Sequence, residues 1–216
     1  MKKFFKKIEI EPVMISLGLV LFQSILFFLL RFIIKSPHVL GNTIDTKIPF
    51  NSYFIIPYYI WYVMILALPY YYYKRDKDLL AKYAVSYIVC AIISTIIFIV
   101  YPSTVIRPEN IPNNNIFNIL TNIVYWVDTP AINCFPSLHC AISMLFILTI
   151  TNSKGTILRN KIIVIVISIL IMASTLYTKQ HVFIDLISGD LLMIFVYSIF
   201  SQNKFLLNKV KKLLKI

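Results

Sequence analysis

The chain has 216 residues, of which 59% are hydrophobic and only 14% are charged. A soluble domain has about 45–50% apolar and about 25% charged residues, so a water-soluble globule, a disordered chain and a coiled coil are excluded. The net charge of +12 comes from basic residues that flank long apolar runs, which indicates anchoring to anionic lipid and not binding to nucleic acid. Continuous apolar runs also exclude a β-barrel, so the composition predicts an all-α polytopic membrane protein.

Six apolar segments are predicted to cross the membrane as helices, because a span needs about 20 mostly apolar residues. The fourth segment is short and follows Pro136, a residue suited to the first turn of a helix. The basic start of the chain leads into a full-length span without a small-residue cleavage site, so we expect no cleaved signal peptide. The expected spans are residues 13–34, 53–73, 79–101, 137–151, 161–177 and 181–200.

The basic residues predict that both termini of this six-helix bundle are cytoplasmic, in a cell membrane. The chain ends and the links between spans two and three and between spans four and five carry 16 of the 21 lysines and arginines. The long outer link between spans three and four contains residues 116–127, with apolar residues at helical spacing and two aromatic residues, Tyr125 and Trp126. We expect an interfacial helix there, and a loop packed on the bundle is the alternative.

Two of the three histidines are predicted to meet at the outer face. His139 and His181 begin the fourth and sixth spans, and the chain crosses the membrane twice between them. Both imidazoles therefore return to the same face at a similar depth. Asp185 follows His181 by four residues, so it shares a helix face with the ring and can accept its Nδ1 proton. His38 lies in the first outer loop, where we expect a solvated side chain.

Positive groups are expected around these histidines. Arg107 follows the third span, and Lys179 stands two residues before His181. Two helix N-termini point into the same region, and Ser137 can add a hydroxyl donor. This combination of donors predicts a site for an anion such as phosphate.

Three segments resemble the signatures of the type 2 phosphatidic acid phosphatase superfamily. That family has Lys, six residues, Arg-Pro; then Pro-Ser-Gly-His; then Ser-Arg, five residues, His, three residues, Asp. The order and spacings agree with this chain, and its third segment looks most like the inositol phosphorylceramide synthase branch. The corresponding residues here are Val100, six residues, Arg107-Pro108; Pro136-Ser137-Leu138-His139; and Ser174-Thr175, five residues, His181, three residues, Asp185.

The resemblance implies one integral membrane domain over residues 1–216, with a phosphatase-like core at about residues 79–202. It implies a lipid phosphate phosphatase without a metal or other cofactor, acting on phosphatidic acid, phosphatidylglycerol phosphate or a polyprenyl (di)phosphate at the extracytoplasmic face. In such an enzyme His181 would attack phosphorus, Asp185 would orient it, and His139 would protonate the leaving oxygen. The phosphoryl oxygens would be held by Arg107, Ser137 and Lys179.

Val100, Leu138 and Thr175 depart from the family pattern, and two of these changes remove a phosphate-binding cation. Lys179 is expected to replace one of the lost charges. The departures leave open a head-group phosphotransferase, with a lipid or sugar alcohol as acceptor in place of water. A non-enzymatic transporter or scaffold is the third possibility, and the sequence leaves open whether the chain is a monomer or a homo-oligomer.

Four further residues have open roles. A zinc site could combine His139, His181 and Asp185 with Cys134 or Cys140, although the spacing fits no familiar zinc pattern. We expect these two cysteines to be free thiols.

Asp190 lies deeper in the last span, where we expect a hydrogen bond within the bundle; a proton relay is the alternative. Arg31 is expected to reach lipid phosphate at the outer end of the first span, and a role in substrate binding is the alternative.

Overall fold

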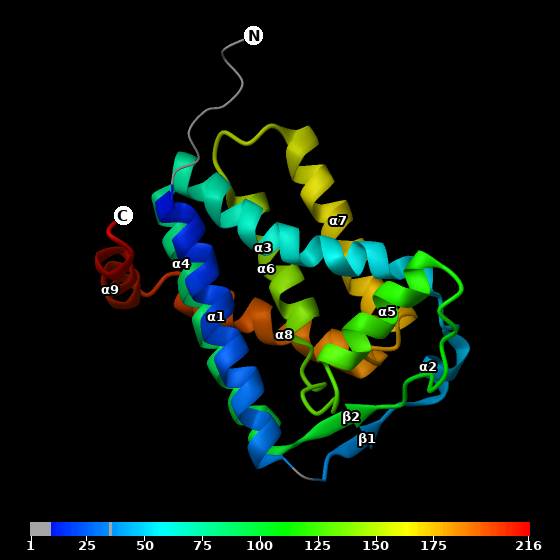
Figure 1. Ribbon diagram of the computed structural model, residues 1–216. Helices are drawn as coiled ribbons and strands as arrows, with labels where there is room; N and C mark the ends of the chain where they lie inside the picture. The colour runs from blue at the N-terminus through cyan, green and yellow to red at the C-terminus, as the bar shows by residue number, and fades with distance from the viewer. Residues whose placement is uncertain (1–9, 35) are drawn as a thin grey trace.

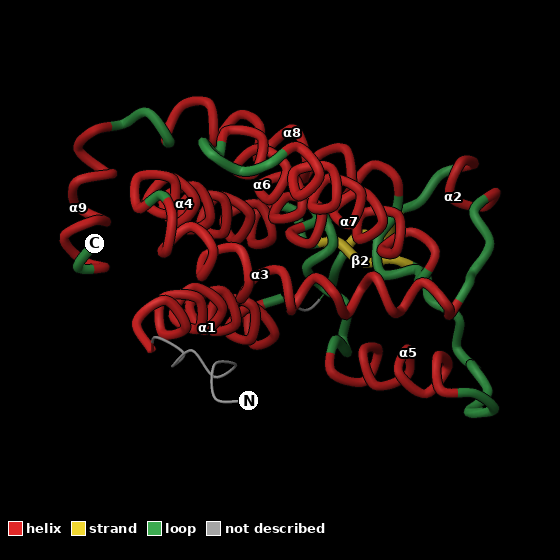
Figure 2. The backbone as a smooth tube through the Cα atoms, turned by 90° about the horizontal axis from the view of Figure 1, so that it is seen from above, coloured by secondary structure: helices red, strands yellow, loops and turns green. Residues whose placement is uncertain are grey.

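The computed structural model describes residues 10–34 and 36–216, so the lysines Lys2, Lys3, Lys6, Lys7 and Lys35 lie outside the described residues. Most of the described chain is helical, as Figures 1 and 2 show. In chain order the elements are α1 (Ile10–Ile33), β1 (His38–Leu40), α2 (Thr43–Lys47), the 3-10 helix η1 (Ser52–Phe54), α3 (Ile55–Arg75), α4 (Lys77–Val100), β2 (Ser103–Val105), α5 (Ile116–Val127), α6 (Leu138–Asn152), α7 (Leu158–Tyr177), α8 (Phe183–Phe200) and α9 (Lys204–Leu214).

Five described helices are long and apolar enough to cross a membrane, namely α1, α3, α4, α7 and α8. They correspond to five of the six expected spans. The expected fourth span corresponds to α6, which has only 15 residues. At a rise of 1.5 Å per residue it is about 22 Å long, against about 30 Å for the hydrocarbon core of a bilayer. Length and composition therefore support five spans, and a sixth is not established.

Large apolar side chains face outward from the long helices. Phe32 of α1, Val63 of α3 and Leu191 of α8 are 83%, 61% and 61% exposed. Such a surface is unfavourable in water and is compatible with lipid, because lipid tails are as apolar as these side chains. The exposed faces agree with the membrane assignment made from composition.

The short helix α6 lies in the interior, against α4, α7 and α8 (Figure 1). Its side chains Ile142, Leu145 and Phe146 have no exposed surface. The hydroxyl of Tyr72 donates a hydrogen bond of 2.9 Å to Thr149, which joins α3 to α6. This bond gives two buried hydroxyl groups a hydrogen-bond partner. α6 is therefore a fixed support for whatever its first turn carries.

Two short strands were not predicted by the all-α assignment. β1 and β2 pair in parallel, with His38 opposite Ser103. They follow α1 and α4, so their pairing shows that these two helices end at the same side of the bundle. His38 remains exposed, and its ring stacks on Tyr101 with the centroids 5.0 Å apart.

The amphipathic helix α9 was also not predicted. Its Lys211 Nζ lies 2.5 Å from Oδ1 of Asp78, at the start of α4. This pair brings the lysine-rich end of the chain to the basic turn between α3 and α4. The helix predicted over residues 116–127, in contrast, exists with the expected bounds as α5, and its Trp126 is 80% exposed.

Candidate active site

His181 lies in the turn between α7 and α8 and is 7% exposed. Its Nδ1 is 3.2 Å from Oδ2 of Asp185, whose side chain is fully buried. The same carboxylate oxygen accepts a hydrogen bond of 3.2 Å from the backbone N–H of Val182. In the tautomer with its proton on Nδ1, the ring donates to this carboxylate, which fixes its orientation and leaves Nε2 with a free lone pair.

His139 lies in the first turn of α6, beside His181. The centroids of the two rings are 5.9 Å apart, and the ring planes are inclined by 54°. Trp61 and Tyr58 of α3 pack on His139 with centroid distances of 4.3 and 4.7 Å. Nε2 of His139 is buried and has no hydrogen-bond partner among the described residues. The structure thus brings together the two rings that the topology predicts to meet.

A close approach of two helices sets this arrangement. The backbone N–H of Ser137 donates a hydrogen bond of 3.1 Å to the carbonyl of Asp185, so the start of α6 is tied to α8. One turn further along α8, a Cβ added to Gly189 would lie 2.3 Å from the carbonyl oxygen of Ser137. Only a residue without a side chain fits there, and the contact holds the elements of His139 and His181 together.

Arg107 reaches the same region from the loop after β2. Its guanidinium pairs with the carboxylate of Asp128 and donates to Oε1 of Gln180, the residue before His181. It also lies over the ring of Tyr125, 4.9 Å from the centroid. Gln180 is 2% exposed, and its Nε2 has no partner among the described residues. Gln180 thus places an amide donor next to His181, whereas Arg107 contacts Gln180 and Asp128 and, like Lys179, is not among the residues that line the cavity described below.

Two residues expected to hold phosphate are used differently. Nζ of Lys179 donates to the backbone carbonyls of Asp45, at 3.0 Å, and Ile48. Lys179 is not among the residues that line the cavity described below. Ser137 is fully buried, and its hydroxyl caps α6 by accepting a hydrogen bond of 3.3 Å from the N–H of Cys140. The structure does not bring these two side chains to the histidines' cavity.

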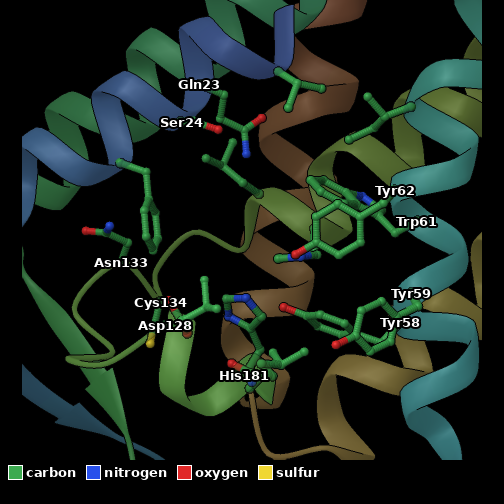
Figure 3. Close-up of a pocket in the computed structure, with 18 of the residues that line it drawn as sticks. Gln23, Ser24, Tyr58, Tyr59, Trp61, Tyr62, Asp128, Asn133, Cys134 and His181 are labelled. Atoms are coloured by element: carbon green, nitrogen blue, oxygen red, sulfur yellow. The ribbon is translucent and has the colours of Figure 1, made fainter. Parts of the chain in front are cut away.

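The histidines line a cavity of about 420 Å³ between α1, α3, α4 and α5. Figure 3 shows His181 and Asp128 at one part of it, opposite the rings of Tyr58, Tyr59 and Trp61. Most of its surface is apolar, and α1 contributes Val20, Phe27 and Phe28 together with the polar Gln23 and Ser24. The lining suits a ligand with a long apolar part and one polar end.

The sequence matches the PAP2 superfamily over residues 28–199. The chain belongs to the PAP2 superfamily. Members of this superfamily are phosphoesterases and phosphotransferases, and membership suggests an activity of this kind for the chain. No curated protein and no solved structure matched the chain. The match includes Arg107, His139, His181 and Asp185.

Two positions at which the PAP2 pattern has a phosphate-binding cation are occupied here by Val100 and Thr175. Val100 is 78% exposed at the end of α4. Thr175 is fully buried, and its carbonyl accepts from the N–H groups of Gln180 and His181, at 2.9 and 3.1 Å. Thr175 thus shapes the turn that carries the histidine and cannot supply the missing charge. Sequence reasoning missed Gln180, Asp128 and the two rings on His139, because none of them belongs to a motif.

The zinc alternative is only partly assembled. One ligand atom each from Cys134, His181 and Asp185 lie within 4.8 Å of one another, but His139 and Cys140 are not in this group. Burial, and then the nearby Asp185 carboxylate, raise the pKa of the Cys134 thiol well above its usual value. A structural zinc site has four protein ligands, and the described residues group only three here.

The structure also shows the state of the two cysteines and the contacts of Arg31 and Asp190. Cys134 and Cys140 are free thiols, as expected. The Arg31 guanidinium donates to the carbonyl of Val127 at the end of α5 and does not line the cavity. Oδ1 of Asp190 is buried without a partner among the described residues, so the expected hydrogen bond within the bundle is not observed at that atom.

Proposed function

We propose that the chain is a membrane-embedded lipid phosphate phosphatase that works through a phosphohistidine on His181 and needs no metal ion. One observation carries the proposal: two imidazole rings 5.9 Å apart line an apolar cavity, and one of them is oriented by the buried carboxylate of Asp185. A neutral imidazole with a free Nε2 is a nucleophile, and a second imidazole beside it can transfer a proton.

The reaction has two steps. Nε2 of His181 forms a bond to phosphorus while the bond from phosphorus to the lipid oxygen breaks, and His139 gives a proton to that oxygen. His139 then accepts a proton from water, whose oxygen bonds to phosphorus as the P–N bond breaks. Inorganic phosphate leaves, and both rings return to their starting state. Asp185 stabilises the positive charge that His181 acquires in between.

Arg107 and Gln180 are the proposed ligands of the phosphoryl oxygens. The guanidinium supplies charge and two directed N–H donors, which suit a phosphate. Nε2 of Gln180 is buried without a partner, and a phosphoryl oxygen would satisfy it. Arg107 must then exchange its contact with Asp128 for the substrate. Lys179 and Ser137 are given positioning roles instead, because their polar atoms are already engaged.

The apolar cavity supports a lipid substrate, and phosphatidic acid, phosphatidylglycerol phosphate and polyprenyl (di)phosphates all have the required polar end. We also propose that α6 is a sixth crossing segment, that α5 lies at the outer interface, and that both termini are cytoplasmic, which puts the site at the extracytoplasmic face of the cell membrane. The enclosure of α6 by its neighbours supports this topology, because a helix shielded from lipid need not match the bilayer thickness.

Transfer of the phosphoryl-containing group to an alcohol is a second candidate function. Asn133 lines the cavity, and neither its amide oxygen nor its amide nitrogen has a partner among the described residues. A hydroxyl group can donate to one and accept from the other. This pairing supports an alcohol acceptor beside the lipid, which is the chemistry of the inositol phosphorylceramide synthase branch.

The test is phosphate release by the purified protein from each of the three lipid classes, in detergent, with and without glycerol as acceptor. We expect His181→Ala to abolish turnover and His139→Ala to lower it by about 10²- to 10⁴-fold. His38→Ala is the matched control and should retain full activity, and EDTA should have no effect. Consumption of the lipid that requires glycerol and yields a phosphate ester of glycerol, without free phosphate, would favour the transferase. Activity that survives His181→Ala, or that is lost to EDTA and restored by zinc, would refute the mechanism.

A further inference from the structure

The first outer loop contacts the turn that carries His181 at several points on both sides of the histidine. Before it, the N–H of Asn51 donates a hydrogen bond of 2.9 Å to the carbonyl of Tyr177. The Lys179 ammonium donates to the carbonyls of Asp45 and Ile48. After it, the N–H of Phe183 donates a hydrogen bond of 2.7 Å to Oδ1 of Asp45. Residues 42–51 thus form a clamp around residues 177–183.

Asp45 is the centre of the clamp. It is 9% exposed, and its Oδ2 accepts a hydrogen bond of 2.9 Å from the N–H of Asn42 in the capping box of α2. Phe183 is the first residue of α8, and N–H groups at a helix start have no acceptor within the helix. The carboxylate of Asp45 satisfies one of them and is favoured by the helix dipole. The start of α8 is therefore fixed by a residue far away in the sequence.

The backbone of Lys179 is in the left-handed region, with φ of +53°. This conformation is unfavourable for a residue with a Cβ, so the surroundings must hold it in place. The two hydrogen bonds from its ammonium to the clamp do so. Because His181 follows two residues later, the backbone geometry of the nucleophile depends on the same contacts.

We propose that the clamp of residues 42–51 positions the nucleophile, and that Asp45 and Lys179 are positioning residues for phosphoryl transfer. The proposal rests on the proposed function. Asp185 orients the ring of His181, whereas the clamp fixes the backbone from which the ring projects. A reacting group displaced by about 1 Å can lose about 100-fold in rate, so a loosened clamp lowers kcat. Arg107 lies outside the clamped segment and remains in place, so the binding of substrate changes less than kcat does.

The first experiment compares kcat and KM of variants on the best lipid phosphate. Asp45→Ala and Lys179→Met should each lower kcat by about 10- to 100-fold and leave KM within about threefold. Asp45→Asn keeps an acceptor and Lys179→Arg keeps a donor, so both should retain most of the activity. The double variant Asp45→Ala, Lys179→Met should lose no more kcat than the more damaged single variant, because both changes disrupt the same set of contacts. Lys47→Met is the control, since Lys47 is exposed on α2.

A higher KM for Lys179→Met at unchanged kcat would make Lys179 a phosphate ligand and overturn the proposal, as would losses that multiply in the double variant. Hydrogen exchange of the Phe183 amide tests the clamp without any activity. Protection of that amide should fall in Asp45→Ala and persist in Lys47→Met, and unchanged protection in Asp45→Ala would refute the clamp. A wild-type protein that hydrolyses no lipid phosphate would refute the proposed function, while the exchange measurement still decides the clamp.

Discussion

Replacing Gly189 by alanine should disrupt the contact that brings the two histidines together. The new Cβ would lie 2.3 Å from the Ser137 carbonyl oxygen, 3.2 Å from its carbon and 3.3 Å from the nitrogen of Ala141. The first distance is about 1 Å shorter than the 3.4 Å at which ordinary contact begins. All three atoms are backbone atoms in the first turn of α6, so no side chain can rotate away. The start of α6 or α8 must shift by roughly that amount.

Overpacking of this kind costs about 1–3 kcal/mol of unfolding free energy, and a shift of about 1 Å at a reacting group costs about 100-fold in rate. We therefore expect Gly189→Ala to lower both the melting temperature in detergent and kcat. Gly18→Ala is the matched control, because nothing lies within 4 Å of the added Cβ on α1. Alanine should stabilise that helix by about 0.5–1 kcal/mol. A Gly189→Ala protein with wild-type melting temperature and kcat would refute the close approach.

Two further predictions concern the site. Asp128→Asn removes a carboxylate that neutralises Arg107 and repels an anion. The affinity for vanadate should therefore rise by about threefold to tenfold, as expected for the loss of one partly exposed negative charge. Weaker binding in a vanadate inhibition assay would mean that Asp128 orients the guanidinium. The raised pKa of the Cys134 thiol keeps it protonated in mildly alkaline solution. Its alkylation, measured by mass spectrometry, should therefore stay slow from pH 7 to pH 9 in the folded protein. It should become fast after denaturation. Rapid alkylation of Cys134 in the folded protein would contradict its burial.

The sequence was informative where helix periodicity and topology suffice. His139 and His181 start helices separated by two crossings of the bundle, so their meeting follows from the order of the elements alone. His181 and Asp185 pair as predicted, but not on one helix face: His181 lies in the turn before α8, and Asp185 in the first turn of α8 contacts it. The helix over residues 116–127 was predicted with the bounds of α5, because its apolar spacing is regular.

The direction of individual side chains could not be predicted. Lys179 adopts a positive φ, and its ammonium is bonded to the loop that contains Asp45, a contact between residues 134 positions apart. No local pattern encodes such a contact. Gln180 is a polar residue beside a histidine, and only its burial identifies it as a donor. The strands β1 and β2 have three residues each, too few to show alternation.

The position of α1 separates two properties of the protein. The superfamily match begins at residue 28, whereas Val20, Gln23, Ser24 and Phe27 of the cavity wall precede it. The proposed reacting groups lie within the matched residues. Most of the cavity wall that α1 provides, which would contact the hydrocarbon part of a substrate, lies outside them. If the proposed function holds, exchanging this first helix between relatives should change which lipid is accepted and leave the bond-breaking step unaltered.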